Sequence, residues 1–329
     1  MKKRILIPVC TVLIVIAIHL IIGFIPGSPK GAYLSNQNSS TETIVLYDYI
    51  ADTERNAVIS GQQESTWMGS ADYETDYIYE ASGKLPVIKG FDYMNDDFDG
   101  VNERAIKWHE KGGIVTICWH CGSDFSGEWK HCKETDIADW EKALTEGTEE
   151  YEKLVSGMDK GARALKELEA KGIPVLWRPF HEFDGDWFWW SRGGSECFKK
   201  LWKLMYDRYT NYHGLDNLIW VLGYSHKMQN VKDWYPGDEY CDIIGADTYD
   251  IKIIHKLYRK MKGVTDAPKP LCLHECGENP TEKDLKISPW NYFMTWHTEY
   301  LTDTNTPEEI KALYNSELVL TMSEEYISQ

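Results

Sequence analysis

Two glutamates that follow separate apolar runs are the residues of this chain best suited to carry out chemistry. Glu182 lies in the stretch 177–190, which reads WRPFHEFDGDWFWW, and four consecutive aromatic residues come shortly after it. Glu275 directly follows another apolar run, 270–274, much further along the chain. Two carboxyl groups that face each other across an aromatic cleft are the minimum equipment for glycoside hydrolysis, because one protonates the leaving oxygen and the other attacks the anomeric carbon.

The elements that must position these glutamates are eight short apolar runs that alternate with longer helical patterns. The runs cover residues 57–61, 86–91, 113–118, 173–178, 217–222, 241–246, 270–274 and 292–296. Near-continuous apolar runs are typical of strands that are covered on both faces. Eight of them with intervening helices predict an α/β fold, a (β/α)8 TIM barrel, whose active site lies at the C-terminal strand ends. A doubly wound open sheet is less favoured, because no G-x-G-x-x-G follows the first run.

One long helix is predicted between the third and fourth runs. Apolar residues recur there at roughly helical spacing from Trp140 to Leu168. Gly172 then ends the helix just before the next strand, since glycine readily adopts the left-handed conformation that terminates helices.

The stretch 177–190 resembles the acid/base signature of glycoside hydrolase family 26, whose members are chiefly endo-β-1,4-mannanases. Weaker similarities follow in the family's order at other strand ends and near the end of the chain. These lie at residues 61–63, 90–93, 119–120, 245–249, 296–297, 308–314 and 319–321. The resemblance covers most of the chain after residue 41. It implies a retaining hydrolase that cleaves internal β-1,4-mannosidic bonds of mannan or glucomannan and needs no cofactor or metal.

The same resemblance implies that Glu182 is the acid/base and Glu275 the nucleophile. Retention requires carboxyl oxygens about 5–5.5 Å apart, so that a covalent glycosyl-enzyme can form. We expect Glu182 to hold a proton near neutral pH, because it would lie beside Trp187 in a partly desolvated site and near the charge of Glu275. We expect Glu275 to stay ionised, with Tyr249 or Arg178 as a hydrogen-bond donor.

Seven further residues are candidates to bind the substrate or to orient the carboxyl groups. They are His120, Arg178, His181, Trp187, Asp247, Tyr249 and Trp296. Several of them also fit structural roles. His120 and His181 suit satisfied structural histidines, and Arg178 suits a buried salt bridge. Asp247 and Tyr249 are two residues apart, so on a strand both face the same way, although either could cap the strand end.

The sequence leaves alternatives open for the glycan substrate and for the class of protein. After Trp119 and His120 the chain reads Cys-Gly-Ser-Asp-Phe, where mannanases often show Asn-Pro nearby. Within the family, a β-1,3-1,4-glucanase or a xylanase is the alternative to a mannanase. From a different class, a non-catalytic polysaccharide-binding barrel at the cell surface is the alternative. The presence of both Glu182 and Glu275 favours the enzyme.

Charge and composition limit the classes of partner that this protein can bind. The chain has 52 acidic and 35 basic residues and a formal net charge of −17, which would repel a phosphate backbone and excludes nucleic acid as a partner. A neutral polysaccharide such as β-mannan is compatible with this charge. The 14 tryptophans and 20 tyrosines suit a wet binding cleft, because each joins a flat apolar face to a polar edge.

Cysteines offer a third hypothesis, a zinc or thiol enzyme. Cys118 and Cys121 form one C-x-x-C, and His131 and Cys132 follow it, but no second C-x-x-C stands at a suitable spacing. A disulfide among Cys118, Cys121 and Cys132 is left open by the sequence.

The N-terminus has the pattern of an exported protein. Lys2, Lys3 and Arg4 precede an apolar run over residues 5–25 that is long enough to span a bilayer. We predict a signal peptide or signal anchor over residues 1–26, a flexible tether over 27–41 and the hydrolase domain over 42–329. We therefore expect an extracellular monomer, either secreted or anchored to the outer face of the cell membrane through an uncleaved N-terminal segment.

Overall fold

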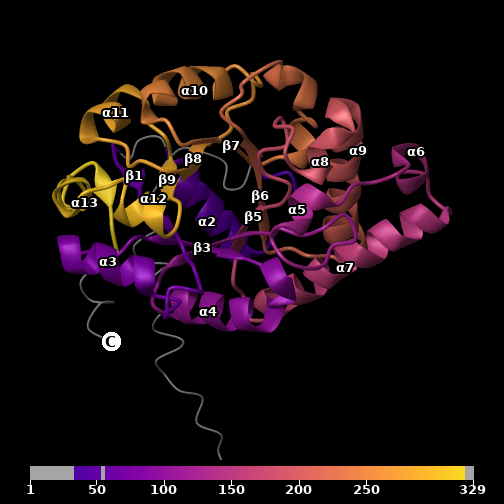
Figure 1. Ribbon diagram of the computed structural model, residues 1–329, viewed down its shortest axis with the longest axis horizontal. Coiled ribbons are helices and arrows are strands. Elements are labelled where there is room, and N and C mark those ends of the chain that lie inside the picture. Colours follow the sequence, from indigo (N-terminus) through magenta and orange to yellow (C-terminus); the bar gives the residue numbers. More distant parts are fainter. Residues whose placement is uncertain (1–32, 53–55, 323–329) are drawn as a thin grey trace, which may run out of the picture.

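A closed barrel of eight parallel strands forms the centre of the molecule (Figure 1). The computed structural model describes residues 33–52 and 56–322. The barrel strands are β2 (Gly61–Gln63), β3 (Ile88–Asp92), β4 (Ile114–Cys118), β5 (Val175–Arg178), β6 (Leu218–Tyr224), β7 (Ile243–Thr248), β8 (Leu271–Cys276) and β9 (Tyr292–Thr295). The barrel closes because β9 pairs with both β8 and β2. Each predicted apolar run overlaps a barrel strand, and the first reaches only Gly61 of β2. The (β/α)8 prediction is confirmed.

Two short strands extend the sheet at the N-terminal end of β2. These strands, β1 (Val58–Ile59) and β10 (Val319–Leu320), pair with each other in parallel, and β1 also pairs with β9. The end of the described chain is thereby tied to its first strand.

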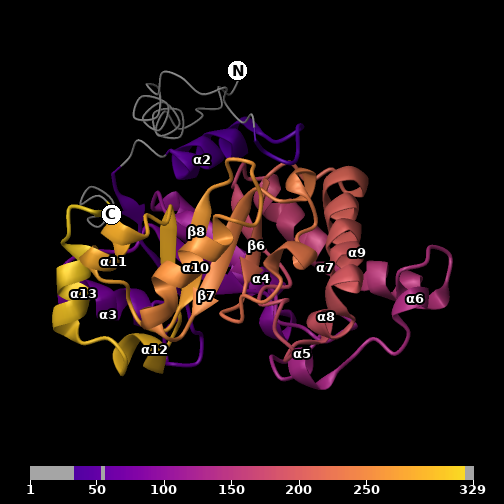
Figure 2. The same ribbon diagram turned by 90° about the horizontal axis from the view of Figure 1, so that it is seen from above.

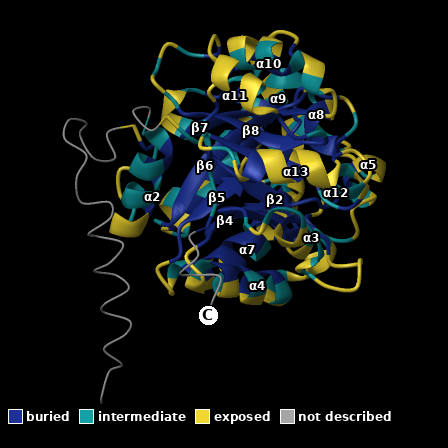
Figure 3. Ribbon diagram, turned by 90° about the vertical axis from the view of Figure 1, so that its left-hand side faces the viewer, coloured by how far each residue is buried: buried dark blue, intermediate teal, exposed yellow. Residues whose placement is uncertain are grey.

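Helices surround the barrel, with their exposed faces outward and the strands buried inside them (Figure 3). They are α2 (Thr41–Ala51), α3 (Tyr73–Ser82), α4 (Phe98–Glu110), α5 (His131–Glu134), α6 (Trp140–Ala143), α7 (Glu149–Glu169), α8 (Trp189–Arg192), α9 (Gly194–Tyr206), α10 (Ile254–Met261), α11 (Glu282–Ile287), α12 (Glu299–Thr302) and α13 (Pro307–Tyr314). A π-helical turn, η2 (Asp207–Tyr212), continues α9, and short 3-10 turns are η1 (Met94–Asp96), η3 (Val231–Trp234), η4 (Asp238–Tyr240) and η5 (Ile251–Ile253).

The N-terminal end of the barrel is closed by α2 (Figure 2). Tyr47 and Ile50 of this helix are buried in an apolar cluster with residues from the beginnings of several strands, including Ile88 and Ile219. Burial of this surface stabilises the closed end at about 25 cal/mol per Å² of apolar area. The opposite end of the barrel, where α5 and α12 lie, is the end at which a (β/α)8 barrel carries its site.

The helix predicted between the third and fourth runs is two helices. Gly147 has a φ of 86°, and the side chain of Thr148 accepts a hydrogen bond from the Tyr151 N–H as the N-cap of α7. This local capping interrupts a helix that apolar spacing alone predicts to be continuous. The predicted stop is confirmed, because Gly172 has a φ of 69° and its N–H donates to the Glu169 carbonyl oxygen.

The second half of the segment predicted as a tether packs against the barrel. Leu34 is only 3% exposed, the Ser35 N–H donates to Asp242, and the Asn36 side chain donates to the Leu215 carbonyl oxygen. The folded part therefore begins by Leu34, ahead of the predicted boundary at residue 42. The predicted signal segment and residues 27–32 lie outside the described residues. Among the helices that are described, none is both long enough and apolar enough to cross a membrane.

Candidate active site

Glu182 and Glu275 meet at the C-terminal end of the barrel. Glu182 lies in the turn after β5, and Glu275 lies near the end of β8. One oxygen from each, together with one from Asp247 on β7, lies within 4.8 Å of the other two. This close approach fits the carboxyl spacing of retaining glycosidases and is shorter than the 6.5–9.5 Å of inverting ones. Both glutamates are buried, with exposures of 8% and 3%.

A strained turn aims the Glu182 carboxyl group. Glu182 has a φ of 55°, a left-handed conformation that non-glycine residues seldom adopt. The turn is held because the Glu182 N–H donates to the Gly223 carbonyl oxygen over 2.7 Å, and the Ser225 N–H donates to Asp184 over 2.6 Å. Five residues further on, Trp187 donates a hydrogen bond from its indole N–H to Glu182 over 2.7 Å. Strain of this kind persists where the surrounding structure fixes it, as it does at many functional sites.

Glu275 accepts hydrogen bonds on both carboxyl oxygens. Arg178 donates to Oε2 over 3.1 Å, and the Tyr249 hydroxyl donates to Oε1. Both predicted donors are therefore in place. His274 lies 3.1 Å from the same Arg178 nitrogen, and its other ring nitrogen lies 3.3 Å from the Tyr224 carbonyl oxygen. Arg178 is thus positioned from the barrel interior and, at 1% exposed, directs its charge at Glu275.

The protonation of Glu275 differs from the expectation that it stays ionised. Burial raises the pKa of Glu275 to about 7, and the neighbouring Glu182 adds to this, while Arg178 and Tyr249 act in the opposite direction. Glu275 is therefore not ionised throughout the neutral range. Burial, followed by the charge of Glu182, raises the pKa of Asp247 well above its usual value. Neither Asp247 oxygen accepts a hydrogen bond, which likewise favours the protonated form of this carboxyl group.

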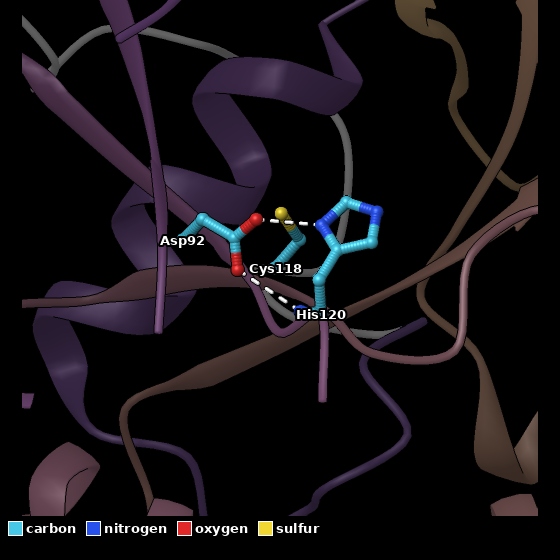
Figure 4. A group of neighbouring side chains, drawn as sticks. All are labelled: Asp92, Cys118 and His120. Atoms are coloured by element: carbon cyan, nitrogen blue, oxygen red, sulfur yellow. Dashed lines mark hydrogen bonds and ion pairs between the residues drawn. The ribbon is translucent and has the colours of Figure 1, made fainter. Parts of the chain in front are cut away.

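Asp92 is a site residue that sequence reasoning did not single out. It lies at the end of β3 and accepts two hydrogen bonds from His120, one from the backbone N–H over 3.0 Å and one at Nδ1 over 2.6 Å (Figure 4). Burial alone would raise the pKa of Asp92, but His120 holds it below its usual value. The sequence feature that could have identified Asp92 is its place as a carboxylate at a strand end, within the family-like segment 90–93. Asp92 fixes the imidazole so that its other nitrogen is free for a ligand.

The two predicted histidines lie together. Their rings are 4.6 Å apart and nearly perpendicular, and His181 Nε2 lies 4.0 Å from a Glu275 oxygen. Burial, followed by the charges of His120 and Arg178, lowers the pKa of His181 well below its usual value, so this imidazole is neutral. His181 and His120 therefore line the site as polar groups next to the nucleophile candidate.

The cysteine pattern does not assemble as the zinc hypothesis requires. Cys118 approaches Asp92 and His120, rather than joining Cys121 and His131. Its thiol donates to the Phe91 carbonyl oxygen over 3.5 Å, and burial raises its pKa well above the usual value, so it is not a thiolate ligand. All seven cysteines from Cys118 to Cys276 are free thiols, and the disulfide that the sequence left open is not formed.

Aromatic residues divide between the cleft and the core. Of the four consecutive aromatics at 187–190, Trp187 is partly exposed and the other three are buried. Trp187 stacks on His226 with ring centroids 5.8 Å apart. Trp296 lies 6.2 Å from His120 and, with Tyr249, which is 39% exposed, adds ring surface to the cleft. Trp119 is 3% exposed and belongs to the core.

A cavity of about 820 Å³ lies elsewhere, toward the N-terminal end of the barrel, where Ile50 of α2, Tyr258 of α10 and Trp290 help to line it. None of the nine predicted site residues lines this cavity. The arrangement of carboxyl groups, rather than cavity volume, therefore marks the site.

Known proteins share this fold and this sequence pattern. The chain is 31% identical over 327 residues to a mannan endo-1,4-beta-mannosidase of Thermothelomyces thermophilus, a match that covers 91% of this chain and 65% of that protein. Two mannan endo-1,4-beta-mannosidases of Piromyces sp. are 32% identical, and this chain spans 51% and 48% of their length.

Solved structures are also similar to this chain in fold and in sequence. GH26A from Muricauda sp. has a TM-score of 0.81 and 32% identity, covering 87% of this chain and 98% of that one. A beta-mannanase from a symbiotic protist of the termite Reticulitermes speratus, complexed with gluco-manno-oligosaccharide, has a TM-score of 0.80 and 27% identity, covering 88% and 96%. The family model of glycosyl hydrolase family 26 matches residues 35–324. The chain therefore belongs to glycosyl hydrolase family 26.

Proposed function

We propose that this protein hydrolyses internal β-1,4-mannosidic bonds of mannan or glucomannan with retention of anomeric configuration. The observation that carries the proposal is the approach of Glu182 and Glu275 to within 4.8 Å at the open end of the barrel. The relatives named as mannan endo-1,4-beta-mannosidases support the choice of bond.

In the first step, Glu275 attacks the anomeric carbon and the bond from that carbon to the leaving oxygen breaks. Glu182 gives its proton to the departing oxygen. The Arg178 and Tyr249 donors stabilise Glu275 as an anion before the attack and hold it in line. Trp187, which donates to Glu182, keeps that carboxyl group directed at the leaving oxygen.

In the second step, water replaces the departed sugar and attacks the same carbon. Glu182 takes the proton from the water, and Glu275 leaves as a carboxylate. Asp247 supports both steps by remaining protonated, because three ionised carboxyl groups within 4.8 Å would repel one another strongly. The cleft then carries no more than two of the three negative charges.

Substitution of Glu182 tests the assignment of roles. We expect Glu182→Gln to lower the hydrolysis of mannan by about 10²-fold or more, since general acid catalysis contributes that much. The same variant should still react with 2,4-dinitrophenyl β-mannoside, whose leaving group needs no proton, and should release a burst of dinitrophenol. The exposed Glu308→Gln serves as the control. Unchanged release of reducing ends from mannan by Glu182→Gln would reject the role.

A substrate panel tests the glycan. Mannan, glucomannan, mixed-linkage β-glucan and xylan are each incubated with the protein, and the lengths of the products are measured. We expect cleavage of mannan and glucomannan into mixed oligosaccharides. Cleavage confined to glucan or xylan would replace mannan with the alternative substrate and leave the roles of the two glutamates standing.

We also propose that the protein acts outside the cell as a monomer, either secreted or membrane-anchored. The proposal rests on the basic triplet and the apolar run over residues 5–25, and on the size of a polysaccharide substrate. Fractionation of cells that express the full chain, with N-terminal sequencing and sedimentation of the product, provides the test. Recovery in the cytoplasm would contradict the location, and sedimentation as a dimer would contradict the monomer.

A further inference from the structure

Trp67 presents an indole ring to solvent at the same end of the barrel as the carboxyl groups. It lies in the loop between β2 and α3 and is 53% exposed. Large apolar surfaces left open at the edge of a cleft mark places where a ligand or partner binds. An indole combines a flat apolar face with a polar edge, which suits the face of a sugar ring.

Rings in contact connect Trp67 to the centre of the site. Trp67 meets the edge of His297 at a centroid distance of 4.8 Å, and His297 lies 4.6 Å from Trp296. Trp296 in turn lies 6.2 Å from His120. The exposed indole is therefore an extension of the cleft and not an isolated surface residue.

A buried carboxyl group holds the two loops of this extension together. Glu74 is fully buried, and its two oxygens accept hydrogen bonds of 3.0 Å from the Ser65 N–H and from the Thr298 N–H. The loop that carries Trp67 is thereby tied to the segment that carries His297. A platform that is already ordered loses little conformational freedom when a ligand binds.

Polar groups surround a small hollow beside the indole. The hollow has a volume of about 40 Å³, and Glu64, Asp92, Asn95, Asp97 and Arg104 help to line it. Arg104 donates to Glu64 over 2.8 Å and to Asp97 over 3.2 Å. Oε2 of Glu64, which is 6% exposed, pairs with the Lys89 ammonium group over a longer distance of 3.5 Å. A hollow of this size holds a water-sized group, so it suits one hydroxyl or hydroxymethyl substituent of a sugar and not the ring.

The position of Trp67 across the barrel sets which end of the glycan it meets. Glu182 and Trp187 follow β5, and Trp296 follows β9, which stands opposite β5 in the closed order of eight strands. The leaving sugars extend past Glu182, because Glu182 protonates the leaving oxygen. The row of rings that ends at Trp67 therefore runs along the other part of the chain, the glycone.

We propose that Trp67 and the polar hollow beside it form a distal glycone subsite. It binds one hexopyranose of a neutral β-1,4-linked glycan, beyond the sugar that Glu275 attacks. The ring stacks on the indole, and one substituent enters the hollow. The proposal rests on the proposed function, since it assigns further sugars to the same cleft.

Two substrates separate this subsite from the catalytic centre. In 2,4-dinitrophenyl β-mannoside the glycone is a single sugar, so the substrate cannot reach Trp67, whereas mannohexaose can. We expect Trp67→Ala to lower kcat/KM for mannohexaose about tenfold, chiefly through KM, and to leave kcat/KM for the aryl mannoside unchanged. Trp67→Phe should recover part of the loss. Tyr212→Ala is the matched control, because Tyr212 is 68% exposed and lies just before β6, toward the N-terminal end of the barrel.

Binding provides a second measurement that does not depend on turnover. In the Glu182→Gln background, calorimetry with mannohexaose should show about tenfold weaker binding after Trp67→Ala. A change below twofold in both measurements, or an equal loss on the two substrates, overturns the subsite. If the unsubstituted protein cleaves xylan or glucan and not mannan, the proposed function fails separately. The comparison is then repeated with xylohexaose or cellohexaose and the matching aryl glycoside, and it decides the subsite by the same criteria.

Discussion

Individual carboxyl groups in this cleft owe their behaviour to neighbours on other strands. Glu275 is buried against Glu182 and is opposed by the Arg178 and Tyr249 donors. Burial and the charge of Glu275 raise the pKa of Tyr249 as well, so the tyrosine hydroxyl stays protonated and continues to donate. In the proposed mechanism Glu275 must be ionised to attack, so its pKa of about 7 should set the acid limb of the activity profile.

Tyr249→Phe tests this relation between Glu275 and its donor. Removal of the hydroxyl takes away an interaction that favours the carboxylate, so the pKa of Glu275 should rise further. We expect the acid limb of kcat/KM to move to higher pH by about one unit, which corresponds to a hydrogen bond of about 1.4 kcal/mol. The measurement is kcat/KM for a soluble mannan from pH 4 to pH 9.

The direction of that pH shift shows whether Tyr249 acts on Glu275 or on the substrate. An acid limb that stays in place while kcat falls at every pH would show that Tyr249 acts on the substrate and not on Glu275. Tyr212→Ala, which removes an exposed tyrosine away from the cleft, should leave the whole profile unchanged.

At the level of the strands, glycines in the barrel wall make room for the polar layer under the site. A Cβ on Gly223 of β6 would lie 2.6 Å from His274, and one on Gly245 of β7 would lie 2.8 Å from the same imidazole. His274 contacts Arg178, which donates to Glu275. The lack of side chains at Gly223 and Gly245 leaves room for His274. His274 in turn positions Arg178, the donor to Glu275.

Gly223→Ala tests this dependence of the site on its strands. The added methyl group should displace His274 and with it Arg178, at a cost of about 1–3 kcal/mol in unfolding free energy, as in other overpacked cores. We expect kcat on mannan to fall at temperatures where the protein is still folded. Chemical denaturation and steady-state kinetics measure the two effects.

Gly263→Ala is the matched control for that substitution. No atom outside the chain neighbours lies closer than 3.5 Å to the Cβ it adds, so neither stability nor kcat should fall. A folded Gly223→Ala protein with unchanged kcat would contradict the link from the strand wall to Glu275.

At the scale of the whole molecule, one end of the barrel is sealed and the other is open. The seal includes α2 and the segment before it, in which Leu34 packs in the same cluster as Tyr47 and Ile50. The segment 33–40 therefore contributes to the stability of the domain, although its sequence has the composition of a linker.

Leu34→Ala tests that contribution. Loss of a buried leucine side chain should lower the unfolding free energy by about 2–3 kcal/mol, which amounts to several degrees in Tm. Thermal denaturation of the full chain measures it, with the exposed Asn38→Ala as the control. Equal Tm values for the two variants would contradict a stabilising role for this segment and would support the flexible tether that its composition predicts.

The barrel and the candidate catalytic pair could both be predicted from the sequence alone. Strands that are covered on both faces must be apolar along their whole length, so each of the eight runs was visible without any tertiary information. Glu182 and Glu275 stood out as a pair, because a closed barrel brings two strand-end carboxylates to one rim and four aromatic residues follow the first. The helix stop at Gly172 was visible for a similarly local reason, the left-handed backbone that glycine accepts.

The tertiary structure decided which groups hold protons and which aromatic rings face the ligand. The pKa values of Asp247 and Glu275 depend on burial and on charges from other strands, and neither has any trace in local sequence. The same holds for the pairing of Asp92 with His120 and for the contact of Trp67 with His297, because each joins residues from loops on different strands. A pattern along the chain reports the environment of one segment, whereas the chemistry of this cleft arises from distances between segments that only the closed barrel fixes.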